Sequence, residues 1–445
     1  MKLPDYNSAW LISLVFVITS IMKKTWAYYR LRHIKGPPGT GLTNFFHSRE
    51  MIRPNVHDWY KNVIEKYGRI ARVAPNLIIT SSPEVWAQVN IKAGYKRSDW
   101  YFQGFRFEHR RDNVFSQTDN KKHDERRKQM APGYSGRENH EIEATIDARV
   151  QEFVQLIKTK YLSTEARLIP MECAQKIQYF TLDVISSVGL GRPFGMLVND
   201  RDVVNFIASA EEGLYKASVF ITLGISWLAY IPWLCMLLAP SPKDAGGFGK
   251  IVGICFGWVD QRAADHTDER SDMIASFIRH GLAGDELRTE AEIDEAVQSG
   301  DALSSSTGII RLDRAKKLPY LQAVIREGIR TWPPVVNPLC KDVPPGGDTV
   351  TVDGKSVFIP GGTCVAYSAV AMHRDEEIYG DDAQSFRPER WFEKDPAKLA
   401  AMTRTNDLIF GHGRWHCLGK PVAMLELYKL TFEVRNINDS KRTAR

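Results

Sequence analysis

The first strongly apolar stretch of the chain lies close to its N-terminus. Residues 9–22 read AWLISLVFVITSIM without a charged side chain, and Lys23 and Lys24 follow directly. The run is short for a transmembrane helix, which needs about 20 apolar residues. A cleaved signal peptide carries its positive charges before the apolar run and a small-residue cleavage site after it, and this order is not found here. We therefore predict an uncleaved membrane anchor over residues 1–24, which leaves the rest of the chain in the cytosol.

A second charge-free stretch covers residues 217–240, ASVFITLGISWLAYIPWLCMLLAP. Its length alone is that of a membrane span. Pro232 lies near its middle and Gly-Ile-Ser at 224–226 interrupts it, and both features break a straight helix. The sequence therefore leaves two interpretations open. One is a second membrane span, and the other is a pair of buried or membrane-dipping helices that admits apolar substrates.

The remaining pattern alternates between the periods of helix and strand. The predicted elements are two short strands within residues 69–80, mostly helix over 138–190, a helix over 318–332 and an Asp-Gly hairpin at 350–360. Residues 25–40 contain Lys-Gly-Pro-Pro-Gly, which predicts a stiff hinge. We therefore predict one α+β, mainly α, body over residues 41–445.

Composition narrows the possible functions. With 445 residues, 43% of them hydrophobic, the chain can form two or three domains or one large enzyme domain. The formal charge of +6 comes without a long basic block, which favours contact with anionic lipid over nucleic acid. The six cysteines are scattered and form no C-x-x-C pair. This spacing argues against a zinc knuckle or a disulfide-stapled secreted domain, and it favours a reduced compartment that faces the cytosol.

The strongest chemical signal surrounds Cys417. The sequence Phe410-x-x-Gly413-x-x-x-Cys417-x-Gly419 precedes a predicted helix over residues 421–434. A cysteine just before a helix receives backbone N–H groups and the positive end of the helix dipole, and both lower the pKa of its thiol. Glycines let the backbone pass close beneath a large flat cofactor, and Phe410 can shield the sulfur from water. This arrangement suits a single axial bond to haem iron better than an inert buried cysteine.

The loop resembles the haem-binding signature of the haem-thiolate monooxygenases, the cytochrome P-450 family. Two further motifs, Glu327-Gly-Ile-Arg330 and Phe386-Arg-Pro-Glu-Arg390, precede it in the family's order. By itself an E-x-x-R pattern is an ordinary surface ion pair. The resemblance implies that Glu327, Arg330 and Arg390 form a buried cluster that holds the polypeptide under the haem. It also implies haem b as the cofactor, with Cys417 as axial ligand of the iron, in a fold of many helices and small β-hairpins around the haem.

The resemblance also implies contacts to the haem propionates. His123-Asp-Glu-Arg-Arg127 resembles the helix whose arginine pairs with a propionate, with His123 where the family usually has tryptophan. The run KKHDERRK is also compatible with a solvated basic helix face. The family often places arginine two residues before the cysteine, and this chain has Trp415 there and Arg414 one step earlier. The predicted cofactor-binding residues are Cys417, Phe410, Gly413, Gly419, Arg414, Trp415, His123 and Arg127, and His416 is interpreted as a local hydrogen-bonding residue.

The activity implied by the resemblance is insertion of one oxygen atom from O₂ into an apolar small molecule. Electrons would come from NADPH through a reductase, and the cysteine thiolate would favour O–O cleavage by donating electron density to the iron. The implied location is the endoplasmic reticulum membrane, with the catalytic body facing the cytosol. The segments SDMIASFIRHGL and MAPGYSGREN are most similar to fungal pisatin-demethylase-like members of secondary metabolism.

Two departures from the family pattern stand beside these matches. The family has a long central helix with an O₂-activating turn between SFIRHGL and the helix that contains Glu327, and residues 284–319 offer no apolar helix of about 20 residues. Ala263–Thr267 resembles that turn but lies upstream, inside a polar run. We predict that this helix is missing around residues 285–300 and that pocket-lining strands are missing after residue 434. The alternatives are therefore a haem-thiolate isomerase or dehydratase that needs no O₂ activation, and a non-catalytic remnant or misspliced product.

Overall fold

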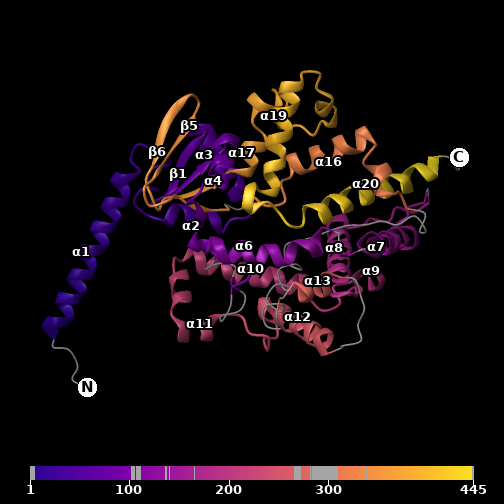
Figure 1. The fold of residues 1–445 in the computed structure, drawn as a ribbon, viewed down its shortest axis with the longest axis horizontal. Helices are drawn as coiled ribbons and strands as arrows, with labels where there is room; N and C mark the ends of the chain where they lie inside the picture. Colours follow the sequence, from indigo (N-terminus) through magenta and orange to yellow (C-terminus); the bar gives the residue numbers. More distant parts are fainter. Residues whose placement is uncertain are drawn as a thin grey trace.

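The computed structural model is mainly helical and contains two small sheets (Figure 1). It describes residues 6–101, 106, 112–135, 138–139, 141–164, 166–264, 272–280, 282, 309–336 and 339–442. The helices are α1 (Tyr6–Arg30), α2 (Phe45–Met51), α3 (Val56–Tyr67), α4 (Pro83–Ile91), α6 (Asn120–Tyr134), α7 (Ile142–Leu156), α8 (Cys173–Leu190), α9 (Met196–Asn199), α10 (Phe206–Thr222), α11 (Pro232–Leu238), α12 (Gly247–Ala264), α13 (Met273–Arg279), α15 (Leu312–Ala315), α16 (Pro319–Thr331), α17 (Ala369–His373), α18 (Glu376–Tyr379), α19 (Pro396–Asp407) and α20 (Lys420–Arg442). The strands are β1 (Ile70–Ala74), β2 (Leu77–Thr80), β3 (Lys96–Arg97), β4 (Lys341–Asp342), β5 (Asp348–Val352), β6 (Lys355–Ile359) and β7 (Cys364–Tyr367). The predicted α+β, mainly α, class is confirmed.

The larger sheet joins five strands in the order β1-β2-β7-β4-β3. β2 and β7 are parallel, and the other neighbours are antiparallel. Successive side chains of a strand point to opposite faces. Ile78 therefore packs in one cluster with Trp86 of α4, whereas Ile79 packs in another with Tyr60 of α3. The sheet is covered by a helix on each face, and β1 and β2 confirm the strands predicted within residues 69–80.

The smaller sheet is the predicted hairpin. β5 and β6 pair antiparallel, with Val352 opposite Lys355. Asp353 and Gly354 between them have φ angles of 51° and 73°. A two-residue hairpin turn of type I′ requires positive φ at both central positions, and Asp-Gly is a favoured pair for it. The turn chemistry thus fixes this hairpin locally.

A helical half holds the largest apolar core. Phe153 of α7, Phe180 of α8 and Phe277 of α13 are buried in it. Val422 and Leu425 of α20 belong to the same cluster. The first turns of α20, which directly follow Cys417, are therefore held by core packing, and α7, α8 and α13 lie beneath α20 in Figure 1.

The N-terminal helix differs from the predicted anchor and hinge. α1 continues through Arg30, so the first residues of the predicted hinge over residues 25–40 are helical. In the part of the chain that the structure describes, no helix combines the length and the apolar character needed to cross a membrane. The anchor predicted over residues 1–24 is therefore not supported.

The second apolar stretch forms a broken pair of helices. α10 ends at Thr222, Gly224 has a φ of 69°, and α11 begins at Pro232. Glycine in the left-handed region and proline at a helix start are the two features that interrupt the run. The structure thus has separate helices over residues 217–240 in place of one continuous span.

The two predicted departures from the family pattern are a deletion around residues 285–300 and missing strands after residue 434. The deletion predicted around residues 285–300 lies outside the described residues, and so do Asp265, His266 and Thr267 of the motif at Ala263–Thr267. The helix predicted over residues 421–434 is α20, which begins at Lys420 and continues to Arg442.

A buried histidine makes the fold sensitive to acid. His373 of α17 is fully buried, and neither ring nitrogen has a hydrogen-bond partner among the described residues. Burial, and next the charge of Arg330, lowers the pKa of His373 to about 3. The unfolded chain binds a proton here below a pH of about 6.5 and the folded chain does not, so stability is lost as the pH falls from 6.5 towards 3.

We expect this side chain to lower the free energy of unfolding by about 1.4 kcal/mol between about pH 7.5 and about pH 5.5. Urea titrations of the wild type and of His373→Gln at both pH values measure the difference. The glutamine variant should lose that part of the pH dependence, whereas His33→Gln, at an exposed position, is the matched control and should keep it. An identical pH dependence in wild type and His373→Gln would contradict the assignment.

Candidate functional site

The loop around Cys417 is shaped by two glycines with positive φ. Gly411 has a φ of 72° and Gly413 a φ of 59°. A Cβ atom on Gly411 would lie 2.4 Å from the backbone oxygen of Trp415, so no other residue fits there without rearrangement. The backbone N–H of Cys417 donates to the oxygen of Phe410 over 2.6 Å. These contacts close the loop immediately before α20.

Opposing effects act on the sulfur of Cys417. Burial is the largest and raises the pKa of the Cys417 thiol above its usual value. The backbone N–H groups of Gly419 and Lys420 and the guanidinium of Arg127 act in the opposite direction. The predicted N–H groups are present and lower the pKa as expected, but burial outweighs them. A cation bound to the sulfur would supply the missing stabilisation of the thiolate.

α6 brings two predicted residues beside this loop. It is capped by Asp119, whose side chain accepts from the backbone N–H of Lys122. His123 and Arg127 are four residues apart and therefore share one face of the helix. His123 is fully buried, its Nδ1 lies 3.0 Å from Asp124, and its Nε2 has no hydrogen-bond partner among the described residues. Burial, and next the charge of Arg97, lowers the pKa of His123 to about 3.

Trp415 packs against His123 and two cations that the sequence motifs do not contain. The ring centroids of Trp415 and His123 are 4.6 Å apart. The Lys341 ammonium nitrogen lies 4.5 Å from the Trp415 ring centroid, and the Arg97 guanidinium carbon lies 5.0 Å from it. Lys341 is 3% exposed, and no carboxylate of the described residues forms an ion pair with it. Burial, and next the charge of Arg97, lowers the pKa of Lys341 well below its usual value.

The other predicted residues of the loop lie outside this buried group. Arg414 is 40% exposed and pairs with Asp124, with 3.6 Å between nitrogen and oxygen. The Lys420 ammonium nitrogen lies over the ring of Phe410, 5.1 Å from its centroid. Trp415 thus lies with the buried cations, whereas Arg414 lies at the surface.

The three residues of the E-x-x-R and downstream arginine motifs meet in a fully buried cluster. Glu327 Oε1 lies 2.8 Å from Arg330 Nη2 and 2.9 Å from Arg390 Nε. Trp391 Nε1 donates to the other carboxylate oxygen over 3.0 Å. Burial would raise the pKa of Glu327, but hydrogen bonds from Arg330 and from the backbone of Arg387 outweigh it and hold this pKa below the usual value. Glu327 is therefore a buried carboxylate in its charged form.

The two arginines of this cluster also hold backbone. Arg330 Nη1 donates to the carbonyl oxygens of His373 and Ala383, both over 2.7 Å. Arg390 Nη1 donates to the carbonyl oxygen of Tyr379 over 2.6 Å. The cluster therefore fixes the irregular segment that follows α17 and precedes the cysteine loop.

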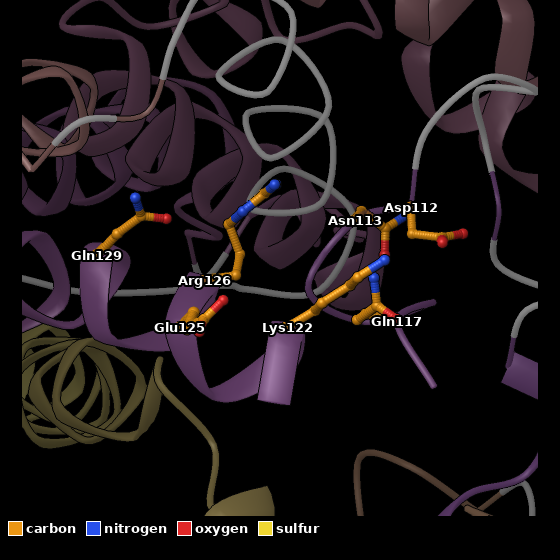
Figure 2. Close-up of a pocket in the computed structure, with 7 residues that line it drawn as sticks. All are labelled: Asp112, Asn113, Gln117, Lys122, Glu125, Arg126 and Gln129. Carbon is orange, nitrogen blue, oxygen red and sulfur yellow. The ribbon is translucent and has the colours of Figure 1, made fainter. Parts of the chain in front are cut away.

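A separate polar pocket of 390 Å³ lies beside α6 (Figure 2). Its lining residues are Asp112, Asn113, Gln117, Lys122, Glu125, Arg126 and Gln129. The α6 members of this set follow helical spacing on a face next to that of His123 and Arg127. None of the predicted site residues lines the pocket, so it is distinct from the group around Cys417.

Residues 36–247 and 285–433 match the model of the family described as Cytochrome P450. The chain belongs to the cytochrome P450 family. It is 32% identical over 474 residues to the cytochrome P450 monooxygenase ABA1 of Pyricularia oryzae. That alignment covers 96% of this chain and 90% of the relative. It is 32% identical over 412 residues to the cytochrome P450 monooxygenase aba1 of Botryotinia fuckeliana, which covers 84% of this chain and 79% of that protein.

The alignment with the Pyricularia protein is longer than this 445-residue chain, so that P450 contains residues with no counterpart here. A third P450 relative, abl1 of Leptosphaeria maculans, is 29% identical over 447 residues, with 91% of this chain and 77% of the relative covered. The deletion predicted around residues 285–300 stays a prediction.

Cytochromes P450 carry haem, use a redox partner that supplies electrons and act on small molecules. The residues beside Cys417 fit that cofactor, because haem combines an iron ion with two carboxylates. The buried ammonium of Lys341 forms no ion pair with a carboxylate of the described residues, and a buried cation without a counter-charge is unfavourable. Carboxylates bound there would supply this counter-charge. Arg127, Lys341 and Arg97 would thus hold the propionates, with His123 beside them, and Cys417 would hold the iron.

Lys341 and Arg97 were missed because no sequence pattern connects them. They lie on β3 and β4, strands of two residues each that are far apart in the chain. Only the pairing of these strands, which places Arg97 opposite Lys341, brings them together. A buried cation in a short strand after the E-x-x-R helix has no local signal of its own.

Removal of the buried carboxylate should destabilise the P450 fold strongly. We expect Glu327→Ala to cost about 3–5 kcal/mol, because two buried arginines then lose their counter-charge. Chemical denaturation followed by circular dichroism measures this. Glu393→Gln is the matched control, since Glu393 pairs with Lys398 at the surface over 3.0 Å and exposed pairs contribute about 1 kcal/mol at most. Equal losses in the two variants would show that the cluster is not a structural centre.

Proposed function

We propose that this chain is a haem-dependent monooxygenase that inserts one oxygen atom from O₂ into an apolar small molecule. We place the reaction in secondary-metabolite biosynthesis, with electrons from NADPH delivered by a flavoprotein reductase. The proposal is supported by membership of the P450 family and by relatives whose printed names are cytochrome P450 monooxygenases. The observation that carries it is the closed loop that presents one half-buried thiol, Cys417, directly before α20 and beside a group of buried cations.

Each part of the site has a defined task in this proposal. Haem, when bound, supplies the redox chemistry that activates O₂. Cys417 holds the iron through its sulfur, and the N–H groups of Gly419 and Lys420 stabilise the negative charge of that sulfur. The cations beside Trp415 orient the cofactor through its carboxylates. The Glu327 cluster keeps the segment before the loop in place and touches no reacting group.

The first test is the absorption spectrum of the full chain after reduction with dithionite and exposure to carbon monoxide. A thiolate-ligated haem gives a strongly red-shifted Soret band, and this band should disappear in Cys417→Ala. Cys173→Ala is the matched control, because Cys173 is exposed at the start of α8 and should leave the band unchanged. Absence of bound haem, or a band at the position of histidine ligation in the wild type, would overturn the proposal.

Turnover separates the proposal from the alternatives. A monooxygenase consumes NADPH and O₂ with a reductase present and yields a product that is heavier by one oxygen atom. Product formation without NADPH would instead identify a haem-thiolate isomerase or dehydratase. A chain that binds haem through Cys417 and turns over no substrate under either condition would be a non-catalytic member.

Location is part of the same proposal. We propose that the chain works at the endoplasmic reticulum membrane with its catalytic body facing the cytosol, where a reductase can reach it. Fractionation of cells that express the tagged full chain tests this, and recovery only in the soluble fraction would contradict it.

A further inference from the structure

Two basic side chains lie directly opposite each other on neighbouring strands of the larger sheet. Arg97 of β3 and Lys341 of β4 are register partners, and both residues are buried, with exposures of 7% and 3%. Like charges directly across a pair of strands are destabilising, and burial strengthens their repulsion. Arg97 donates to the carbonyl oxygens of Val114 and Phe115. Lys341 forms no ion pair with any carboxylate of the described residues. The arrangement therefore needs another source of negative potential.

Aromatic ring faces supply part of the negative potential around Arg97 and Lys341. The Arg97 guanidinium carbon lies 5.1 Å from the ring centroids of both Tyr101 and Phe115 and 5.0 Å from that of Trp415. The Lys341 nitrogen lies 5.1 Å from the Tyr101 centroid and 4.5 Å from the Trp415 centroid. Trp415 is thus the ring nearest to both cations, and indole has the strongest attraction for a cation among the three ring types.

Trp415 also connects the cations to the cysteine loop. It is 8% exposed, ends the 3-10 turn Gly413–Trp415 and stands two residues before Cys417. Its other neighbour is the ring of His123, whose Nε2 has no hydrogen-bond partner among the described residues. Arg97, Lys341 and His123 therefore come from three separate elements and meet at one indole ring.

We propose that Trp415 is a positioning residue: its indole ring gathers Arg97 and Lys341 so that together they receive the carboxylates of bound haem. This inference rests on the proposed function, because it requires haem in the site. Trp415 itself carries no charge and acts through its neighbours. An arginine side chain at this position would contribute a cation directly, whereas this chain uses a neutral platform that organises cations from other elements.

If Trp415 acts through the cations, the affinity for haem depends on the two carboxylates of the cofactor as well as on its porphyrin ring. Haem dimethyl ester has the same porphyrin and iron but lacks the two negative charges. Ferric haem and its dimethyl ester are therefore matched probes, and each is titrated into the full chain purified without haem while the Soret band is followed. We expect the wild type to bind haem at least about 10-fold more tightly than the ester.

In Trp415→Leu we expect haem binding to weaken by about 10-fold or more while ester binding stays within about 2-fold. Trp415→Phe keeps a ring and should retain most of the preference. Lys341→Met should weaken haem binding and spare ester binding in the same way as Trp415→Leu. The double variant should lose much less haem affinity than the two single losses combined, because both substitutions remove the same interaction. Trp258→Leu is the matched control. Trp258 lies on α12, away from the site, and the Arg192 guanidinium carbon lies 4.0 Å from its ring centroid.

Three outcomes would overturn the inference. Equal weakening of haem and ester binding in Trp415→Leu would mean that Trp415 only packs the loop. Full additivity of Trp415→Leu and Lys341→Met would mean that the ring does not act through Lys341. If Trp415→Leu fails to fold, Trp415→Phe and Lys341→Met still decide, because a wild-type haem preference in Lys341→Met contradicts the proposal. A wild type without a thiolate-type Soret band would instead remove the proposed function itself.

Discussion

The carboxylate of Glu327 is shared by two buried arginines, and the position of the cysteine loop depends on that sharing. Arg330 and Arg390 each use their remaining donors on backbone carbonyls of the segment between α17 and the short turn at Pro388–Phe392. Irregular backbone forms few hydrogen bonds within itself, and its buried carbonyl oxygens need hydrogen-bond donors from elsewhere. Removing any one of the three charged groups leaves the others uncompensated in a site of low polarity. The cluster therefore acts as a unit, and its value lies in fixing geometry more than in net stability.

At Cys417 the same low polarity works against the charged form. The backbone N–H groups of Gly419 and Lys420 favour the thiolate, yet burial outweighs them and raises the pKa of the thiol. A metal cation bound to the sulfur would favour the thiolate that burial disfavours. Nearby, Lys341 shows the opposite problem, because burial disfavours its cation until an anion arrives. Haem combines a metal cation with two carboxylates, so its binding would offset the burial of the Cys417 thiolate and of the Lys341 ammonium together.

The sequence was most informative where the chemistry requires a fixed spacing along the chain. The loop from Phe410 to Gly419 and the pair Glu327 and Arg330 could be found because their partners are close in sequence. Tertiary contacts decided the rest. Arg97 and Lys341 meet only through the pairing of two very short strands, and Trp415 rather than Arg414 turned out to lie with them. The predicted anchor was drawn from an apolar run and the lysines that follow it, and among the described residues no helix is long and apolar enough to cross a membrane.

The placement of Glu327 itself depends on contacts at the other end of its helix. Lys429 of α20 is fully buried and lies 2.9 Å from Glu143 of α7, and Glu433 accepts from the backbone N–H of Ile310 over 3.0 Å. The first contact holds α20 against α7, and the second holds the chain just before α15 against α20. Because α20 also begins at the cysteine loop, one helix sets the position of the thiol and of the E-x-x-R helix. A disturbance of this junction would therefore move Cys417 and Glu327 relative to each other without touching either residue.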